Sequence, residues 1–401
     1  MPRLSSDVAI VGGGMIGCWS ALFLAKRGLS VTLVEKGAIG AQSSGVNFGN
    51  LRLQGRYGPQ FPLALRAHEL WEQVETLTGD RCEFRATGHV RIAFTAEELE
   101  TVAAHAREAQ GYGLKIELLD REALRRRWPW LTEAALGAGL SPRDATANPR
   151  IASPAVARAA AGLGAQILDN LKVTGIEKSG GGFKLATDRD VILETRFLVN
   201  AAGAWANEVA RRFGEAIPLL VGGPPQFVTA PMPYFIEPYL QAVDGSVILR
   251  QTRRGNVLAT GYPRGPSDAE GNRSPVPPRK TLATMARLVE LVPSLSTAHV
   301  IRVWSGIEGY LADMLPVVSP SGTTEGLFHA AGFCGNGFQL APAVGMVLSE
   351  LIADGRTPTP IALYAIGRFA AASQETGARH SYDFDDSMAA QQPAPQEAGR
   401  A

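Results

Sequence analysis

Four residues near the amino terminus have the types and spacing of a phosphate-binding turn. Gly12, Gly14 and Gly17 form the pattern G-x-G-x-x-G. The first glycine makes a tight turn, the second lets the backbone approach a pyrophosphate, and the third brings a helix close to a strand. Glu35 follows 23 residues after Gly12, where a carboxylate can accept hydrogen bonds from both hydroxyls of a ribose. These residues predict a site for an adenine dinucleotide.

The flanking sequence supplies the elements that such a turn requires. We expect a buried strand at Asp7–Val11, a helix at Met15–Arg27 ended by Gly28, and a second parallel strand at Leu29–Val34. The amino end of that helix carries about half a positive charge and unpaired N–H groups, which suit a phosphate. The alternative is a glycine turn without a ligand. The acid favours a free 2′-hydroxyl, so FAD or NAD is expected rather than NADP.

Composition limits the classes of partner and of chemistry. The chain has 401 residues, 45% of them hydrophobic, and a net charge of +1. A chain of this length can bury two hydrophobic cores. Its small net charge produces only a weak electrostatic field, which predicts a small-molecule partner and no nucleic acid. Three cysteines without C-x-x-C spacing fit a cytoplasmic protein. The six histidines contain no H-x-x-x-H pair, so no metal site is expected. Val8–Ala25 lacks charge but contains four glycines, and we expect no targeting or spanning segment.

After Glu35 the sequence does not continue as a second βαβ unit, which an NAD-dependent dehydrogenase normally needs. Residues 42–56 are instead expected to form a flexible loop rich in glycine and serine. Ser43 and Ser44 could donate hydrogen bonds to phosphate, and Arg52 and Arg56 could bind a substrate carboxylate. A solvated linker with surface or phosphate-facing arginines is the alternative.

The middle of the chain predicts alternating elements. Expected helices cover 62–77, 96–110, 121–128 after the cap Asp120, and 149–163 after Asn148 and Pro149. Expected strands cover 114–118, 165–168 and two segments within 171–187. Short strands interrupted by prolines in 222–279 predict a separate antiparallel sheet.

Two runs of small residues join a strand to a helix. Ala201–Trp205 follows a strand at Phe197–Asn200, and Gly332–Phe338 lies between a strand at Leu327–Ala331 and a helix at Pro342–Ala353. Tight packing alone could explain the first run. A second glycine turn far from the first indicates one long ligand that is touched from both ends of the chain, and FAD has that length.

The segments VAIVGGGMIG, FLVNAAGAW and AAGFCGNGFQLAPAVG together resemble the D-amino acid oxidase family of flavoproteins, over about residues 7–370. SSGVNFGNLRLQGR and WSGIEGYLADMLPVV are most similar to the flavoprotein subunits of opine oxidases and D-hydroxyproline dehydrogenase. The resemblance implies an α/β (α+β two-domain) fold with a GR2-type Rossmann-like FAD-binding domain at 1–84, 145–218 and 320–370. An antiparallel-sheet substrate domain, also discontinuous, would cover 85–144 and 219–319. Residues 371–401 are expected to be a disordered tail.

The same resemblance implies which residues hold FAD. The glycine turn and Glu35 would hold the ADP half, the serines the pyrophosphate side, and the turn after Cys334 the isoalloxazine end. The full set is Gly12, Gly14, Met15, Ile16, Gly17, Glu35, Lys36, Ser43, Ser44, Gly45, Val173, Ala201, Ala202, Gly203, Trp205, Gly335, Asn336, Gly337, Phe338 and Gln339. The residues expected at the catalytic end are Arg52, Arg56, Glu308 and Asn336.

This chain departs from the family pattern at three places. Asn336 stands in a run where relatives often have histidine. Glu308 stands where glycine oxidase has a carboxylate-binding arginine, so we expect Glu308 to select a cationic or N-substituted amine; a salt bridge to Arg302 or Arg56 is the alternative. Tyr310–Val318 contains no cysteine, the covalent anchor in sarcosine oxidases, so FAD should be non-covalent.

The predicted activity is FAD-dependent oxidation of the C–N bond of an amino acid, imino acid, opine or secondary amine, by hydride transfer to flavin N5. O2 or an electron-accepting protein would reoxidise the flavin. A non-catalytic, electron-shuttling subunit of a hetero-oligomer is one alternative function. An NAD-dependent dehydrogenase is the other, which the missing second βαβ unit disfavours.

Overall fold

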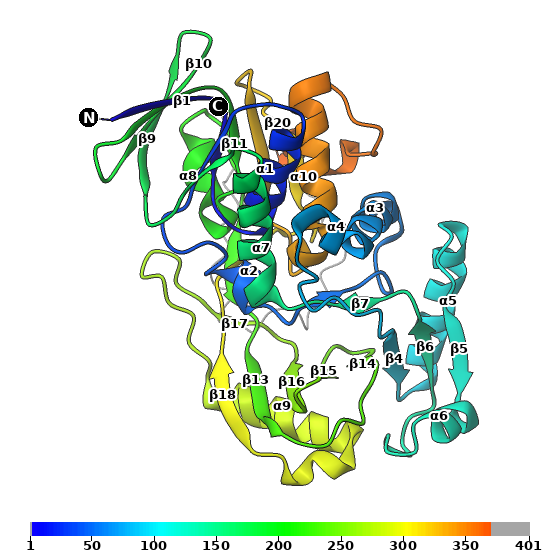
Figure 1. The fold of residues 1–401 in the computed structure, drawn as a ribbon. Helices are drawn as coiled ribbons and strands as arrows, with labels where there is room; N and C mark the ends of the chain where they lie inside the picture. The colour runs from blue at the N-terminus through cyan, green and yellow to red at the C-terminus, as the bar shows by residue number, and fades with distance from the viewer. Residues whose placement is uncertain (1, 370–401) are drawn as a thin grey trace, which may run out of the picture.

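The computed structural model describes residues 2–369 (Figure 1). Strands form two large sheets and two small ones. One large sheet and its helices make up the upper part of Figure 1, and the other makes up the lower part. The expected tail, 371–401, lies outside the described residues.

The upper sheet has a parallel core. Its strand order is β20 (Val317–Pro320), β21 (Leu327–Ala331), β11 (Ile192–Asn200), β1 (Arg3–Val11), β2 (Val31–Val34) and β8 (Gln166–Leu168). The strands from β21 to β8 run parallel, and a hairpin of β9 (Val173–Ser179) and β10 (Gly182–Thr187) joins at β11. Because parallel strands point the same way, the residues that follow β1, β2, β11 and β21 meet at one edge.

Four helices pack together beside this sheet. α1 (Met15–Lys26) contacts α7 (Pro149–Gly162) and α10 (Gly337–Asp354), and α10 also contacts α3 (Phe61–Glu72). All of α1 except Lys26 is buried, which explains why the helix is apolar on every side. Gly28 follows it with φ of +80°, as expected for a left-handed helix end.

The lower sheet is antiparallel apart from one strand pair. Its order is β18 (Val300–Trp304), β13 (Gln226–Pro231), β16 (Asn256–Thr260), β15 (Ile248–Gln251), β14 (Tyr239–Ala242), β4 (His89–Ala93), β6 (Gly137–Ser141) and β5 (Glu117–Asp120), with β14 and β4 parallel. α9 (Pro278–Leu291) packs Leu288 and Leu291 against its core. α5 (Ala96–Gly111) packs against β4, β5 and β6, and α6 (Arg121–Arg127) against β5 and β6.

Two small sheets lie apart from the large ones. The first consists of β17 (Gly265–Pro266), β12 (Leu220–Gly223) and β19 (Glu308–Tyr310). The second pairs β3 (Asn50–Leu51) with β7 (Ala145–Thr146).

The segment 42–56 is more ordered than the predicted loop. It contains the helix α2 (Ser43–Val46) as well as β3. The side-chain amide of Asn47 donates hydrogen bonds to the carbonyls of Ser43 and Ser44, so the short helix has a partner for its last carbonyls.

Several element boundaries were predicted wrongly. β1 begins at Arg3 rather than Asp7, and β11 begins at Ile192 rather than Phe197. The helix expected over 62–77 is two helices, α3 and α4 (Val74–Thr78), separated at Gln73. The strand expected over 114–118 lies at Glu117–Asp120, where it can pair with β6. Helix α10 begins at Gly337 rather than Pro342, so Pro342 lies inside it. Proline has no backbone N–H, and a largely buried helix tolerates the loss of that one hydrogen bond.

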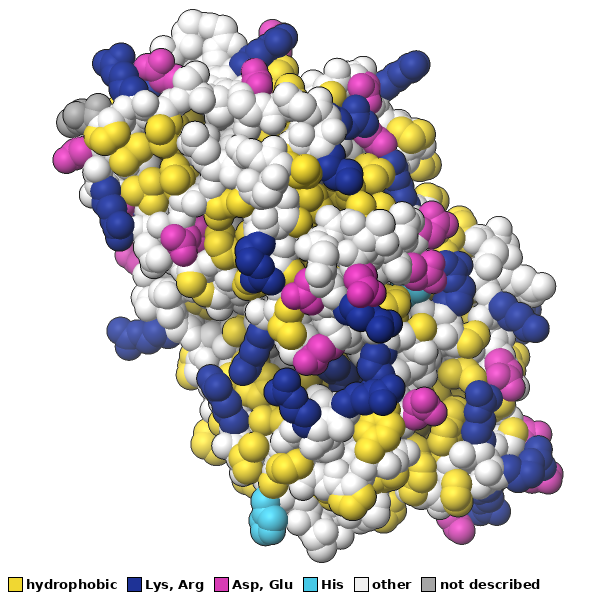
Figure 2. Space-filling view, in the orientation of Figure 1, with side chains coloured by type: hydrophobic (Ala, Val, Ile, Leu, Met, Phe, Trp, Pro, Cys, Tyr) yellow, Lys and Arg dark blue, Asp and Glu magenta, His cyan; other side chains and the backbone are white. Residues whose placement is uncertain are grey.

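Charges of both signs are interspersed on the molecular face in Figure 2, although Lys and Arg side chains gather near its middle.

Among residues 2–369, no helix combines the length and apolar character needed to cross a membrane. Within the same residues, no three His, Cys, Asp or Glu side chains form a group that could hold a metal ion.

Candidate functional site

A cavity of about 1290 Å³ opens at the edge where the parallel strands end. Residues of both large sheets line it, including Val11, Val34, Gln226 and Thr260. Pockets for one drug-sized ligand are typically about 300–1,000 Å³. This cavity therefore has room for a dinucleotide and a substrate together.

The glycine turn lies at one end of the cavity. Gly12 has φ of +113°, and a Cβ there would lie 2.3 Å from the carbonyl oxygen of Ala201. A Cβ on Gly17 would lie 1.9 Å from the carbonyl oxygen of Gly12. Both positions therefore exclude a side chain, and the amino end of α1 is held against the ends of β1 and β11.

The carboxylate of Glu35 lies beside this turn. Its oxygens accept hydrogen bonds from the backbone N–H of Gly13 (2.7 Å) and of Gly37 (2.8 Å). Each oxygen keeps a further lone pair for a ligand hydroxyl. Ser44 Oγ accepts from the N–H of Met15 at 2.9 Å, so α2 covers the positive end of α1.

The second glycine turn reaches the same cavity from the carboxyl end of the chain. Gly335 and Asn336 precede the first turn of α10, and Phe338 and Gln339 lie within it. The thiol of Cys334 is buried and donates to the carbonyl of Gly332 at 3.1 Å. Burial raises the pKa of this thiol to about 12.

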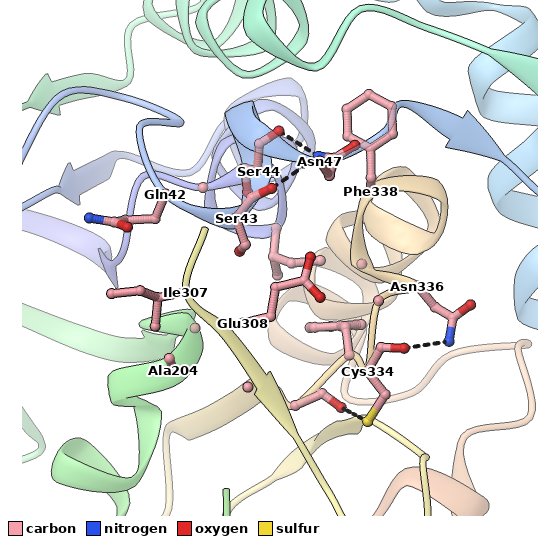
Figure 3. Close-up of a pocket in the computed structure, with 18 of the residues that line it drawn as sticks. Gln42, Ser43, Ser44, Asn47, Ala204, Ile307, Glu308, Cys334, Asn336 and Phe338 are labelled. Atoms are coloured by element: carbon pink, nitrogen blue, oxygen red, sulfur yellow. Dashed lines mark hydrogen bonds between the residues drawn. The ribbon is translucent and has the colours of Figure 1, made fainter. Parts of the chain in front are cut away.

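The structure brings most of the predicted site residues together. Gly17 and Gly45 do not line the cavity, because each packs against backbone of a neighbouring turn. The predicted residues that do line it are Gly12, Gly14, Met15, Ile16, Glu35, Lys36, Ser43, Ser44, Arg52, Arg56, Val173, Ala201, Ala202, Gly203, Trp205, Glu308, Gly335, Asn336, Gly337, Phe338 and Gln339. Figure 3 shows several of them around the cavity.

A group of arginines forms a cationic side of the cavity. Arg52 and Arg56 both donate to Asn336 Oδ1, at 3.1 and 3.3 Å, and Arg56 also donates to Gln339 Oε1 at 2.7 Å. Burial and then the charge of Arg52 lower the pKa of Arg56 to about 9, so it stays protonated at neutral pH. Sequence reasoning missed Arg91, whose guanidinium converges with that of Arg52 beside Gly55.

A buried network behind the arginines holds their loop in place. Asp144 accepts hydrogen bonds from the N–H of Gln54 (3.2 Å), the hydroxyl of Ser141 (2.6 Å) and the hydroxyl of Tyr239 (3.2 Å), and its Oδ2 lies 3.2 Å from His89 Nδ1. Although burial acts in the opposite sense, these hydrogen bonds hold the pKa of Asp144 below its usual value. One buried anion thus stands near the arginine side of the cavity.

Glu308 lies on a different side of the cavity. Its Oε2 accepts a hydrogen bond from the hydroxyl of Tyr310 at 2.5 Å. Burial raises the pKa of Glu308, while the guanidinium of Arg264 and then the hydroxyl of Tyr310 lower it. The cation acting on Glu308 is thus Arg264, rather than Arg302 or Arg56. No motif marks Arg264 in the sequence, because it approaches Glu308 only where β17, which follows Arg264, joins the same small sheet as β19.

The residues present fit FAD. Two glycine turns at the amino ends of α1 and α10 offer unpaired N–H groups to one cavity. The Glu35 carboxylate lies beside the first turn, at the end of β2. Lys36 Nζ lies 3.0 Å from the centre of the Trp205 ring. A cation and an aromatic ring thus line the cavity together with Glu35.

Comparisons with known proteins agree with this geometry. Residues 7–351 match the family described as FAD dependent oxidoreductase (DAO). The chain is 30% identical over 371 residues to glycine oxidase from Geobacillus kaustophilus (strain HTA426), covering 90% of this chain and 97% of that protein. It is 27% identical over 380 residues to sarcosine oxidase subunit beta from Rhizobium meliloti (strain 1021), covering 92% and 89%. Its fold matches L-proline dehydrogenase from P. horikoshii with a TM-score of 0.86 at 26% identity, covering 92% and 99%.

A parallel sheet with a glycine turn, an acid after the second strand and a large cavity at the strand ends is typical of a dinucleotide-dependent oxidoreductase. The chain belongs to the FAD dependent oxidoreductase family, DAO. The predicted family, mixed α/β fold, FAD cofactor and enzyme class are confirmed. The choice left open between FAD and NAD is thereby decided for FAD.

Proposed function

We propose that this chain holds FAD along the cavity and oxidises the C–N bond of an amino acid, imino acid or secondary amine. The observation that carries the proposal is the meeting of two glycine turns, from opposite ends of the chain, in one cavity with arginines beside the second turn. In this proposal the α1 turn and Glu35 bind the ADP half, and the α10 turn faces the flavin ring. The proposal also assigns the upper sheet to the FAD-binding domain and the lower sheet to the substrate domain.

The bound flavin supplies the oxidising chemistry by accepting a hydride. The protein residues bind and orient the substrate. Arg52 and Arg56 form the proposed carboxylate site, since both guanidiniums already meet at Asn336. The N–H groups at the amino end of α10 would favour an anionic group of bound FAD.

The acceptor of the electrons is O2 or a protein. The likeness to a subunit named sarcosine oxidase subunit beta supports a partner subunit as one form of the proposal. A cytoplasmic location also stays part of the proposal, motivated by three free cysteines, all buried.

Anaerobic bleaching of the bound flavin tests the proposed function. Holoprotein is mixed with D-amino acids, imino acids and opines without oxygen, and absorbance near 450 nm is followed. We expect at least one class to reduce the flavin within seconds to minutes. A protein that binds FAD but is bleached by none of these compounds would favour the electron-shuttling alternative.

A further inference from the structure

The cavity has two charged sides that meet at one short turn. On one side, Arg52 and Arg56 donate to the side chain of Asn336. On the other side, Arg264 Nη2 and Glu308 Oε2 lie 3.2 and 3.9 Å from the position that a Cβ on Gly335 would occupy. Gly335 and Asn336 are consecutive, so their Cα atoms are about 3.8 Å apart. One small zwitterion could therefore touch both sides.

The two sides differ in the charge that they offer. The first carries the guanidiniums of Arg52, Arg56 and Arg91, with the carboxylate of Asp144 as the anion nearby. The second offers a carboxylate, Glu308, which in Figure 3 points into the cavity. Tyr310 donates to Oε2 of that carboxylate, and the Arg264 guanidinium also acts on it. An anionic and a cationic group on one ligand match this arrangement.

We propose that Glu308 binds the ammonium group of an amino or imino acid whose carboxylate is held by Arg52 and Arg56, and then accepts the ammonium proton. This inference rests on the proposed function. The N–H bond breaks, its electron pair stays on nitrogen as a lone pair, and the proton forms an O–H bond on the Glu308 carboxylate. The neutral amine can then assist loss of a hydride from the adjacent carbon to FAD.

The surroundings of Glu308 suit a proton acceptor. The titratable groups facing it are the guanidinium of Arg264, the hydroxyl of Tyr310 and the thiol of Cys334, with Tyr262 beside Tyr310. Burial raises the pKa of Glu308, while Arg264 keeps the ionised form accessible. A buried pair of opposite charges such as Glu308 and Arg264 seldom stabilises a fold more than apolar packing would. Stabilisation of the turn is therefore a weak explanation for the presence of this pair in the cavity lining.

A pair of probes that cannot be oxidised tests the binding step. α-Aminoisobutyrate has an ammonium but no hydrogen on its α-carbon, and isobutyrate lacks the ammonium. In calorimetric titrations of holoprotein, we expect the wild type to bind α-aminoisobutyrate at least tenfold more tightly than isobutyrate. Glu308→Gln should abolish that preference, and Glu270→Gln, at an exposed position of the cavity lining, should keep it. A preference that survives in Glu308→Gln would overturn the inference.

The pH dependence of kcat/KM tests the proton transfer, with a substrate that bleaches the wild-type flavin. In Glu308→Gln only the amine already deprotonated in solution can react, so kcat/KM should rise about tenfold per pH unit up to the pKa of the free amine. The wild type should level off at lower pH. Tyr310→Phe removes a hydrogen bond that lowers the pKa of Glu308, so its acidic limb should move to higher pH.

Identical pH profiles for wild type and Glu308→Gln would also overturn the inference. Full FAD content and an unchanged melting temperature would show that both variants are folded. The outcome is separate from the proposed function, which fails only if no amino acid, imino acid or opine bleaches the wild-type flavin.

Discussion

Individual polar residues give the two glycine turns of the cavity different charges. Glu35 lies at the turn of α1, where its oxygens already accept two backbone N–H groups. Arg52 and Arg56 lie at the turn before α10. Because the two groups lie at different turns of the cavity, we expect cofactor affinity and substrate affinity to respond to different substitutions.

Glu35→Ala should weaken FAD binding roughly ten- to a hundredfold. Losing a charge-assisted hydrogen-bonding group costs about 1.5–3 kcal/mol. The dissociation constant is measured by fluorescence quenching as FAD is added to the apoprotein, and excess FAD should restore the folded holoprotein. Glu35→Gln, which keeps one acceptor oxygen, should lose less. An unchanged dissociation constant in Glu35→Ala would remove Glu35 from the site.

Arg52→Ala should lower kcat/KM for an amino acid roughly ten- to a hundredfold and leave FAD affinity unchanged. A charged hydrogen bond to the substrate carboxylate contributes about 1.5–3 kcal/mol. The matching amino acid amide lacks that carboxylate, so its kcat/KM should change little. Arg107→Ala removes an exposed arginine of α5 and serves as the control. Equal losses on the acid and the amide would contradict the assignment.

FAD should be released completely when the protein is precipitated with acid. Covalent attachment to a cysteine needs a thiolate, and burial raises the pKa of the cavity-lining Cys334 thiol to about 12. The absorbance near 450 nm is measured in the supernatant and in the pellet. A yellow pellet would mean that the flavin is covalently bound, and Cys334→Ser would then be the variant to compare.

Helix α1 illustrates how an element depends on one missing side chain. Gly17→Ala places a Cβ 1.9 Å from the carbonyl oxygen of Gly12, so α1 must move and the free energy of unfolding should fall by about 1–3 kcal/mol. Gly162→Ala is the matched control, because a Cβ there meets nothing within 4 Å. It should be neutral or stabilising by about 0.5–1 kcal/mol. Urea unfolding followed by circular dichroism measures both, and equal effects would contradict the packing argument.

Elements with local signals were predicted well. α1 and β2 follow directly from the glycines and the apolar run after them, and Asp120 caps α6 by accepting from the N–H of Ala123 at 2.7 Å. The start of α10 was predicted wrongly, because buried contacts on both sides outweigh the preference of Pro342 for a first turn. Local sequence does not contain that information.

The whole molecule should lose stability in mild acid. Burial lowers the pKa of His89 and of His105 to about 4. For a depressed pKa, the stabilisation is complete above the unfolded value near 6.5 and is lost as pH falls toward about 4. The free energy of unfolding should therefore fall between pH 6.5 and 4, by up to about 1.4 kcal/mol per pH unit for each histidine.

Variants of single histidines check this slope. His105 Nε2 accepts a hydrogen bond from the N–H of Gly55 at 2.6 Å. Protonation of His105 Nε2 would turn this acceptor into a donor that faces the Gly55 N–H. His105→Gln should flatten the decline in unfolding free energy between pH 6.5 and 4. His299→Gln changes an exposed histidine and should leave the slope as it is. The same slope in all three proteins would contradict the prediction for His105.

The sequence alone determined the glycine turn and the acid beside it, because the positions of Gly12, Gly14, Gly17 and Glu35 follow from short-range geometry that any strand–turn–helix unit reproduces. It also indicated the second turn before α10. Only the tertiary structure decided that Arg264 rather than Arg302 or Arg56 acts on Glu308, and that Arg91 converges with Arg52. Arg264 and Glu308 lie at strands of one small sheet that are distant along the chain, and Arg91 of β4 meets Arg52 of the loop after β3. Their distances depend on how strands and sheets pack, and no spacing along the chain encodes that packing.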